Sequence, residues 1–333
     1  MHAPDGFLNA GTAVATGAVS VGTIGVALRR TREQLRDKQV PLAGISAAFI
    51  FAAQMFNFPV AAGTTGHLLG GALAAILLGP ATGTLVVTVV VIVQALAFAD
   101  GGLTALGYNV LNMAVITSFG GYAIFLLARR VLPSNATGVI VATGVAAGLS
   151  VVLAAMAFSI EWLFGATAPV PFDTVFGAMV GVHLLIGIGE AIISAMAVGA
   201  VLAARPDLIY GVRDLDRASL AERPAVGMRG FLIGGVLVAL LFAVVVSQFA
   251  APDPDGLERV ATDAGFIESA QDHALGSSIF ADYATAGVAN ETLSLAIAGA
   301  AGVAITLAVG TGLFFAVRDR RREPGRDRDH AAV

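Results

Sequence analysis

Long apolar stretches set the strongest limit on how this chain can fold. A helix needs about 20 mostly apolar residues to cross the hydrocarbon core of a membrane, because it rises about 1.5 Å per residue. Nine stretches meet or approach this length: 7–28, 40–58, 66–79, 81–99, 103–128, 138–164, 174–204, 230–250 and 293–317. Only 13% of the residues are charged, against about 25% in a soluble domain. The sequence therefore predicts an all-α membrane protein, built as a multi-span helical bundle.

The basic residues follow particular stretches. They come after the first, fifth, seventh and ninth: Arg29, Arg30, Arg32, Arg36 and Lys38; Arg129 and Arg130; Arg205, Arg213, Arg217, Arg223 and Arg229; and Arg318 to Arg328. Lys and Arg accumulate in cytoplasmic loops. With nine spans, this pattern predicts an N-terminus outside the membrane and a cytoplasmic C-terminus, with Arg259 as the exception. The short, glycine-rich stretch 66–79 has to cross the membrane, because only an odd number of spans places the basic residues on the cytoplasmic side.

The charged segments divide the chain into four parts. Residues 1–204 form a predicted seven-span core, and the polar, Arg-rich residues 205–229 form a cytoplasmic linker. Residues 230–318 form a predicted two-span domain, whose acidic loop 251–292 lies outside the membrane. The charged residues 319–333 form a cytoplasmic tail. We therefore expect the lipid bilayer, and no nucleic acid, as the surroundings of this chain.

The absence of cysteine restricts the available chemistry. It excludes disulfides, thiolate zinc sites and cysteine nucleophiles. A transition metal would have to be held by nitrogen, oxygen or thioether ligands. No GxxxxGK[ST] motif surrounds Lys38, the only lysine, so the chain is not a P-loop ATPase. HExxH and GxSxG are missing as well, and we expect a protein that is not an enzyme and has no prosthetic group.

The start of the sequence, MHAPDG, places a histidine at position 2. It has no basic n-region, so we expect no signal peptide, and Met1 should be retained before the bulky His2. The α-amine of Met1, the amide nitrogen of His2 and its imidazole Nδ1 can then chelate one metal in fused five- and six-membered rings. Three nitrogens near one plane, with a fourth from elsewhere, suit Ni(II) or Cu(II), and a modest distortion admits Co(II). The alternative is that His2 is simply an exposed terminal residue.

His67 is the natural source of a fourth nitrogen. It begins the third stretch within GTTGHLLGG, on the same predicted side of the membrane as the N-terminus. Neighbouring glycines such as Gly66 and Gly70 would let another backbone come close. The alternative is an interfacial histidine that makes an ordinary hydrogen bond.

Further polar groups lie at helical depth in the predicted bundle. His183 and Glu190 share the stretch 174–204, and Gln94 and Asn109 lie in two others. Ionisable residues inside a membrane helix are costly and tend to face the interior or a cavity. These side chains could line one cavity, where His183 and Glu190 would orient a metal ligand or pass protons. A buried structural hydrogen bond is the alternative for that pair.

Several blocks of the sequence together resemble a known family. They are MHAPDGFL at the start, GTTGHLLGG at 63–71, GGLTALGYNVLNM at 101–113 and HLLIGIGEA at 183–191. They resemble the CbiM/NikM family, whose members are substrate-capture components of energy-coupling-factor importers for cobalt and nickel. Farther along, PDGLERVATDAGF and ADYATAG resemble the PDGLE-type CbiN/NikN accessory subunits. The chain therefore looks like a natural fusion of a capture subunit and an accessory subunit.

The resemblance implies a metal site and partner subunits. Met1 and His2 would bind the metal through the amine, the His2 amide and the His2 imidazole, and His67 would supply the fourth nitrogen. Three residues, His183, Glu190 and Asn109, fall in family motifs and would surround the ligands. ATP-driven uptake would need a transmembrane coupling (T) subunit and cytoplasmic ATP-binding subunits. The transported ion would be Ni²⁺ or Co²⁺, and the sequence does not choose between them, because both accept nitrogen ligands.

Two positions depart from the family pattern. The family commonly has a larger aliphatic residue at Ala3 and a smaller residue at Tyr108. Neither change touches a ligand, although Tyr108 could alter the packing beside the site.

Two other functions compete with the importer. A proton-coupled secondary permease would use His183 and Glu190 as its relay, and an inverted repeat with matching broken helices would favour it; we find no such repeat. An intramembrane metalloenzyme would hold a metal with His67, His183 and Glu190, and would need an open coordination position. We expect the importer subunit. Its metal affinity should fall as the pH drops, because the ligands must lose protons to bind the metal.

Overall fold

The computed structural model describes residues 1–35, 39–61, 63–213 and 225–318 of the chain. Its α-helices are, in chain order, α1 (Ala10–Gln34), α2 (Val40–Gln54), α3 (Gly71–Leu78), α4 (Pro80–Ala97), α5 (Leu106–Asn109), α6 (Thr117–Arg129), α7 (Ala136–Gly165), α8 (Phe172–Ala204), α9 (Met228–Val244), α10 (Gly256–Ala264) and α11 (Glu291–Val317). Two short strands, β1 (Phe58–Ala61) and β2 (Thr64–Gly66), pair as an antiparallel hairpin.

The remaining elements are short. A π-helical segment, Val110–Ile116, joins α5 to α6. Single 3-10 turns occupy Pro206–Leu208, Tyr210–Val212, Val246–Phe249, Ile267–Ser269 and Ala281–Tyr283. The predicted tail 319–333 and the basic residues Arg36, Lys38, Arg217 and Arg223 lie outside the described residues.

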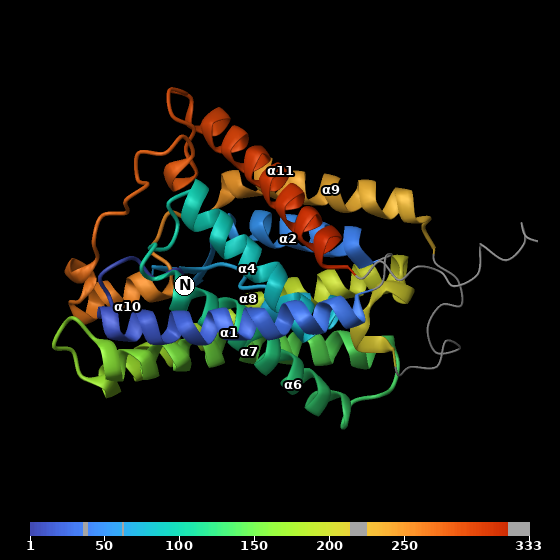
Figure 1. Cartoon of the computed structure of the whole chain (residues 1–333), viewed down its shortest axis with the longest axis horizontal. Helices are drawn as coiled ribbons and strands as arrows, with labels where there is room; N and C mark the ends of the chain where they lie inside the picture. The colour runs from blue at the N-terminus through green and yellow to red at the C-terminus, as the bar shows by residue number, and fades with distance from the viewer. Residues whose placement is uncertain (36–38, 62, 214–224, 319–333) are drawn as a thin grey trace, which may run out of the picture.

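Most of the described helices lie side by side in one bundle (Figure 1). Within the described residues, seven helical stretches are long and apolar enough to cross a membrane: Ala10–Gln34, Pro80–Ala97, Leu106–Arg129, Ala136–Gly165, Phe172–Ala204, Met228–Phe249 and Glu291–Val317. Helix α2 is apolar as well, but it has only 15 residues. The predicted all-α, multi-span membrane protein is therefore confirmed.

The predicted third span, 66–79, is helical only in its second half. After β2 the chain continues without helix to Gly70, and α3 has just eight residues, about 12 Å at 1.5 Å per residue. Gly70 and Gly79 flank this helix with φ angles of 81° and 93°, which residues with a side chain rarely adopt. Pro80 then starts α4, where a proline is tolerated because the first helical N–H needs no partner. The stretch is thus a non-helical segment followed by a short helix rather than one continuous span.

The chain nevertheless passes from one end of the bundle to the other across this stretch. At its far end, the start of α4 lies beside the C-terminal part of α1, where Thr31 Oγ1 is 3.2 Å from Thr82 Oγ1. The basic residues Arg29, Arg32 and Arg318 line one surface hollow at the same end, whereas the N-terminus lies toward the opposite end (Figure 1). These basic residues thus gather at one end, as the parity argument requires, and the predicted orientation in a membrane stays a prediction.

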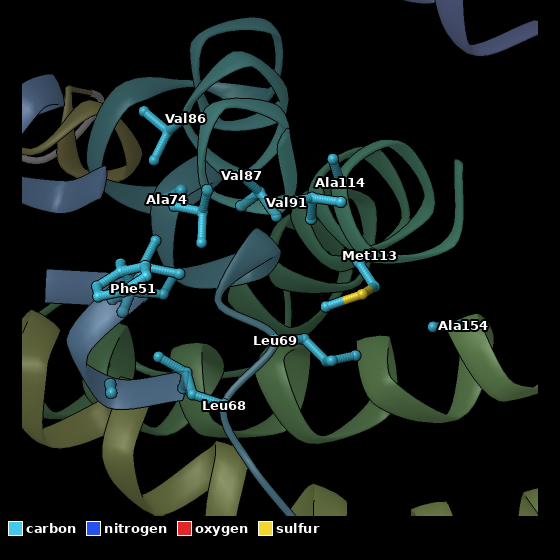
Figure 2. Packing of buried hydrophobic residues seen from close by; sticks show 14 of the residues in the cluster. Phe51, Leu68, Leu69, Ala74, Val86, Val87, Val91, Met113, Ala114 and Ala154 are labelled. Carbon is cyan, nitrogen blue, oxygen red and sulfur yellow. The ribbon is translucent and has the colours of Figure 1, made fainter. Parts of the chain in front are cut away.

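Apolar side chains pack closely around the non-helical chain that precedes α3. Leu68 and Leu69 are fully buried, and Figure 2 shows them among other buried side chains such as Phe51 and Met113. Protein interiors of this density leave little room for movement. The backbone that follows His67 is therefore held in place by the core.

The two C-terminal helices, α9 and α11, pack against α2 on one side of the bundle (Figure 1). Phe242 of α9 and Phe49 of α2 meet with ring centroids 5.5 Å apart. Gly302 of α11 faces Phe51 so closely that an added Cβ would lie 2.1 Å from the ring. The C-terminal helices are therefore part of the same packed body as the core.

The connection between α9 and α11 returns to the end of the bundle that holds the N-terminus (Figure 1). It contains α10 and several turns. Its main chain donates hydrogen bonds to core segments, from Asp282 N to Phe98 O over 2.9 Å and from Gln271 N to Asp5 O over 2.8 Å. It also accepts one at Pro254 O from Thr65 N, over 2.9 Å. This connection therefore covers the N-terminal segment.

Candidate functional site

The N-terminal segment, residues 1–8, is buried in the bundle rather than free in solvent. Met1 is 5% exposed, and Ala3 and Phe7 are 1% exposed. The Phe7 ring packs edge-on against Phe266 with centroids 5.1 Å apart. Chain termini usually fray unless they are tied down, and burial of apolar surface contributes roughly 25 cal/mol per Å². This terminus is therefore held by apolar packing.

Asp5 anchors the middle of this segment. Its carboxylate accepts hydrogen bonds from the main-chain N–H groups of Leu103, Thr104 and Ala105 at 3.1, 2.7 and 3.2 Å, and from the Thr104 hydroxyl at 2.6 Å. These N–H groups precede α5, where free donors and the helix dipole favour a negative charge. Asp5 thus fixes the segment to the start of α5.

Asn109 holds the backbone next to the predicted ligands. Its Oδ1 accepts from Ala3 N over 3.0 Å, and its Nδ2 donates to Ala3 O over 2.9 Å. The Tyr108 hydroxyl donates to Pro4 O over 3.1 Å. Asn109 therefore lies at the N-terminal segment, as predicted, and it contacts main chain rather than the His2 ring. Tyr108, where the family usually has a smaller residue, adds a contact to the same segment.

Met1, His2 and His67 lie together at the beginning of this segment. The α-amine nitrogen of Met1 is 2.6 Å from His67 Nε2. The His2 and His67 rings stack, with centroids 5.2 Å apart and planes inclined by 19°. All three groups are almost completely shielded from solvent. The arrangement can therefore offer a metal ion four nitrogen atoms: the amine, the His2 amide and one from each ring.

Glu190 on α8 positions the chain that follows His67. Its two carboxylate oxygens accept hydrogen bonds from Leu69 N at 2.6 Å and Gly70 N at 2.9 Å. These two N–H groups precede α3 and have no helical partner. Glu190 is fully buried, so its oxygens have no water as an alternative. The carboxylate thus fixes the backbone two residues beyond His67.

His183, seven residues before Glu190 on α8, faces the predicted ligands. Its Nδ1 lies 2.8 Å from Met179 O, and its Nε2 is buried without a partner among the described residues. A cavity of about 10 Å³ lies between His183, Met1 and His67, close to the smallest volume that holds one water. Within the described part of the chain, no hydrogen bond joins His183 to Glu190. The pair predicted as a relay is therefore not in direct contact.

Gln94 contacts the Nε2 atom of the His2 ring. His2 Nε2 is 3.0 Å from Gln94 Oε1, and His2 Nδ1 is 3.3 Å from Asp100 Oδ1. Gln94 Nε2 donates to the Tyr283 hydroxyl over 3.0 Å, and that hydroxyl donates to Asp100 Oδ2 over 2.6 Å. Since the hydroxyl has one proton, it accepts from the Gln94 amide, whose oxygen then faces His2. Both ring nitrogens of His2 thus face an acceptor, Gln94 Oε1 at Nε2 and Asp100 Oδ1 at Nδ1. When the proton is on Nε2, the lone pair is at Nδ1, the chelating atom.

The electrostatics of the site favour a neutral His2 imidazole and an ionised Asp255 carboxylate. Burial lowers the pKa of His2 to about 4, although the Asp100 carboxylate acts in the opposite direction. The imidazole is therefore neutral at pH 7, the form that binds metals. Burial alone would raise the pKa of Asp255, but the charged amine of Met1, together with His67, holds it well below its usual value.

Three side chains at the site were not predicted from the sequence: Asp255, Asp100 and Tyr283. The pattern marks Asp255 only as one of several acids in the loop 251–292, and the PDGLE motif that contains it is the signal that could have identified it. Within the described residues, no group of three or more His, Cys, Asp or Glu side chains could hold a metal ion. A metal bound at this place therefore depends on main-chain nitrogens.

The chain matches two family models. Residues 2–208 match CbiM, described as the cobalt uptake substrate-specific transmembrane region. Residues 229–319 match the PDGLE domain. The resemblance noted in the sequence is therefore confirmed for both parts of the chain.

Known proteins show the same similarity. A protein of Haloquadratum walsbyi assigned to metal transport is 41% identical over 210 residues, which are 63% of this chain and 94% of the relative. The fused nickel transport protein NikMN of Rhodobacter capsulatus is 32% identical over 357 aligned positions, covering 98% of this chain and 100% of the relative. A crystal structure of a truncated transition metal transporter matches with a TM-score of 0.54 and 34% identity, over 61% of this chain and 98% of that chain.

Proposed function

The chain belongs to the CbiM family, the cobalt uptake substrate-specific transmembrane region, and we propose that it captures Ni²⁺ or Co²⁺ with its own N-terminus. It is a multi-pass prokaryotic membrane protein of cobalt or nickel transport. In the proposed site, the α-amine of Met1, the His2 amide nitrogen and His2 Nδ1 chelate the ion. His67 Nε2 supplies the fourth nitrogen.

The contact between the Met1 amine and His67 Nε2 carries this proposal. The two nitrogens are 2.6 Å apart. Metal–nitrogen bonds of about 2.0 Å place neighbouring corners of a square about 2.8 Å apart. An ion could therefore bind both atoms with only a small rearrangement. A square of nitrogen donors suits Ni(II), and a distorted one admits Co(II).

The surrounding residues prepare the ligands for the ion. When Nδ1 binds the ion, Nε2 carries the ring proton and can donate it to Gln94 Oε1, and such outer partners commonly orient metal-binding histidines. Asn109 fixes the chain at Ala3, one residue beyond the chelate. Binding releases protons from the amine and the amide, so affinity should fall as the pH drops.

Uptake, in this proposal, depends on other subunits. The sequence has no P-loop motif, so ATP hydrolysis would come from cytoplasmic ATP-binding subunits joined through a transmembrane coupling (T) subunit. The N-terminus would face outward, and the acidic loop 251–292 would attract cations by its negative field. Residues 1–204 would capture the ion, residues 205–229 would link the two parts, and the domain 230–318 would assist.

Metal binding by the purified protein tests the site. We would compare the wild type with protein whose Met1 amine has been acetylated, and with His67→Ala. Acetylation leaves the sequence unchanged but turns the amine into an amide without a lone pair for the metal, which breaks the fused chelate. His273→Ala serves as the control, because His273 also lies at this end of the bundle and contacts Gly101 O rather than the proposed ligands.

We expect one Ni(II) or Co(II) per wild-type chain, with the visible absorption of a nitrogen-ligated complex. Acetylation of the Met1 amine and His67→Ala should each abolish that binding, and His273→Ala should retain it. Binding that survives acetylation would show that the amine is not a ligand and would overturn the proposed site.

A further inference from the structure

We propose that Asp255 is the positioning residue through which the C-terminal domain holds the Met1 amine beside His67. This inference rests on the proposed function and extends it to the C-terminal part of the chain. Asp255 is neither in the core nor among the proposed ligands. It stands at the start of α10, in the connection that covers the N-terminal segment.

The contacts of Asp255 reach both nitrogens of the proposed site. Its Oδ2 forms an ion pair with the Met1 amine. The same oxygen is 3.6 Å from His67 Nε2. Its side chain is 18% exposed, so the ion pair is largely protected from water, which makes it stronger than a surface pair. Asp255 is thus the charged group that decides where the amine lies.

The rest of the carboxylate is fixed by the local fold. Oδ1 accepts hydrogen bonds from Leu257 N and Glu258 N, both at 2.9 Å, and so caps the N-terminus of α10. The preceding Pro254 accepts from Thr65 N over 2.9 Å, next to β2. One oxygen is therefore committed to the helix and the other is directed at the amine.

This geometry suits the metal-bound state as well as the free state. An amine that binds a metal through its lone pair keeps two N–H groups, and one of them can still donate to Asp255 Oδ2. The carboxylate would then also lie within a few ångströms of a dication, which is favourable in a site with little water. Asp255 consequently holds the amine in place without having to become a ligand.

The substitution Asp255→Asn separates the two tasks of this residue. An asparagine caps a helix about as well as an aspartate, so its oxygen can take the place of Oδ1. Its NH₂ group then faces the Met1 amine, donor against donor. The matched control is Asp263→Asn, because Asp263 lies on the same helix and pairs with Arg259 at an exposed position, 2.8 Å away.

Two measurements on the full-length protein read out the effect. The first is Ni(II) affinity, which should fall about 10- to 100-fold in Asp255→Asn, as is typical for partners of metal ligands, and stay unchanged in Asp263→Asn. The second is the rate at which an amine-reactive ester labels Met1 in the metal-free protein at pH 7. Lys38, the only lysine, is the internal reference. We expect Met1 labelling to rise several-fold in Asp255→Asn relative to Lys38.

The labelling rate distinguishes positioning from a general structural role, because loss of stability alone would not expose the amine selectively. Wild-type affinity together with wild-type Met1 labelling in Asp255→Asn would overturn the inference and leave the proposed metal site intact. Wild-type protein that binds no metal would instead overturn the proposed function. In that case, unchanged Met1 labelling in Asp255→Asn would overturn the hold of Asp255 on the amine as well.

Discussion

The Tyr283 hydroxyl donates to Asp100 Oδ2 over 2.6 Å, and this hydrogen bond determines which end of Gln94 faces His2. Burial and the negative charge of Asp100 raise the pKa of Tyr283 well above its usual value, so the phenol keeps its proton. A residue of the loop 251–292 therefore sets which end of the Gln94 amide meets the His2 ring.

Removal of this hydroxyl should weaken metal binding without unfolding the protein. In Tyr283→Phe, the Gln94 amide loses the partner that orients it and can present its NH₂ group to His2. The ring would then favour a proton on Nδ1, the chelating atom. We expect Ni(II) affinity to fall about tenfold or more, measured by competition with a chelator. Tyr210→Phe at the opposite end of the bundle is the control, and an equal loss there would contradict this account.

Docking of the N-terminal segment should depend on pH through His2. The pKa of His2 is about 4 in the docked segment, against 6.5 for a free histidine. Between these values the undocked state binds more protons, so docking is strongest above about pH 6.5 and weakens as the pH falls towards 4. The total change is about 3 kcal/mol.

Tryptophan fluorescence can follow this transition. Trp162, the only tryptophan, lies 4.3 Å from the Phe266 ring, which packs against Phe7 of the segment. Its emission in the metal-free protein should therefore change as the pH falls from 6.5 to 4. The change should largely vanish in His2→Gln, and a transition that is identical in this variant would assign the titration to another group.

Glu190→Gln should displace His67 from the amine. The N–H groups of Leu69 and Gly70 donate to different oxygens of Glu190. A glutamine replaces one of these oxygens by an NH₂ donor, which faces an N–H group and cannot accept from it. The unsatisfied group costs about 1–3 kcal/mol, which should appear in the unfolding free energy, and Ni(II) affinity should fall as well. Asp173→Asn at the exposed start of α8 should change neither quantity.

Asp5→Ala should detach the N-terminal segment from the start of α5. The variant loses four hydrogen bonds to Leu103, Thr104 and Ala105, and we expect about 2 kcal/mol of lost stability, comparable to the loss of a strong helix cap. Proteolysis near the N-terminus, followed by mass spectrometry, should become faster. Asp5→Asn keeps an acceptor, so its stability and proteolysis rate should lie between those of the wild type and Asp5→Ala. An Asp5→Ala protein that is as resistant to proteolysis as the wild type would show that apolar packing alone holds the segment.

Local patterns in the sequence identified the elements that depend on nearby residues. The apolar lengths predict the long helices, such as α7 and α8, because each must bury or face lipid along its whole length. The MH start and the GH block single out His2 and His67, because scarce ionisable residues in an apolar chain stand out. The structure of the stretch 66–79 is harder to predict from the sequence. The positive φ angles of the glycines that flank α3 are seen only in the folded chain.

The rest of the site depends on contacts between distant parts of the chain. Asp255 meets the Met1 amine across 254 residues, and Tyr283 meets Gln94 across 189. Periodicity and spacing do not distinguish either residue from the other polar residues of the loop 251–292, although the PDGLE motif marks Asp255. His183 and Glu190 are neighbours on one helix, yet the fold gives them different partners, Met179 O and the chain before α3. Spacing along a helix could not reveal that difference.

The cavity between His183, Met1 and His67 measures about 10 Å³, room for about one water molecule. A dication in solution carries a full hydration shell, which is several times larger. An ion bound at the proposed site beside this cavity would therefore have to exchange most of its waters for protein nitrogens on the way in, and recover them on the way out. Ions would bind to and dissociate from such a site slowly even at moderate affinity. A captured ion would therefore stay with the protein until the surrounding helices move.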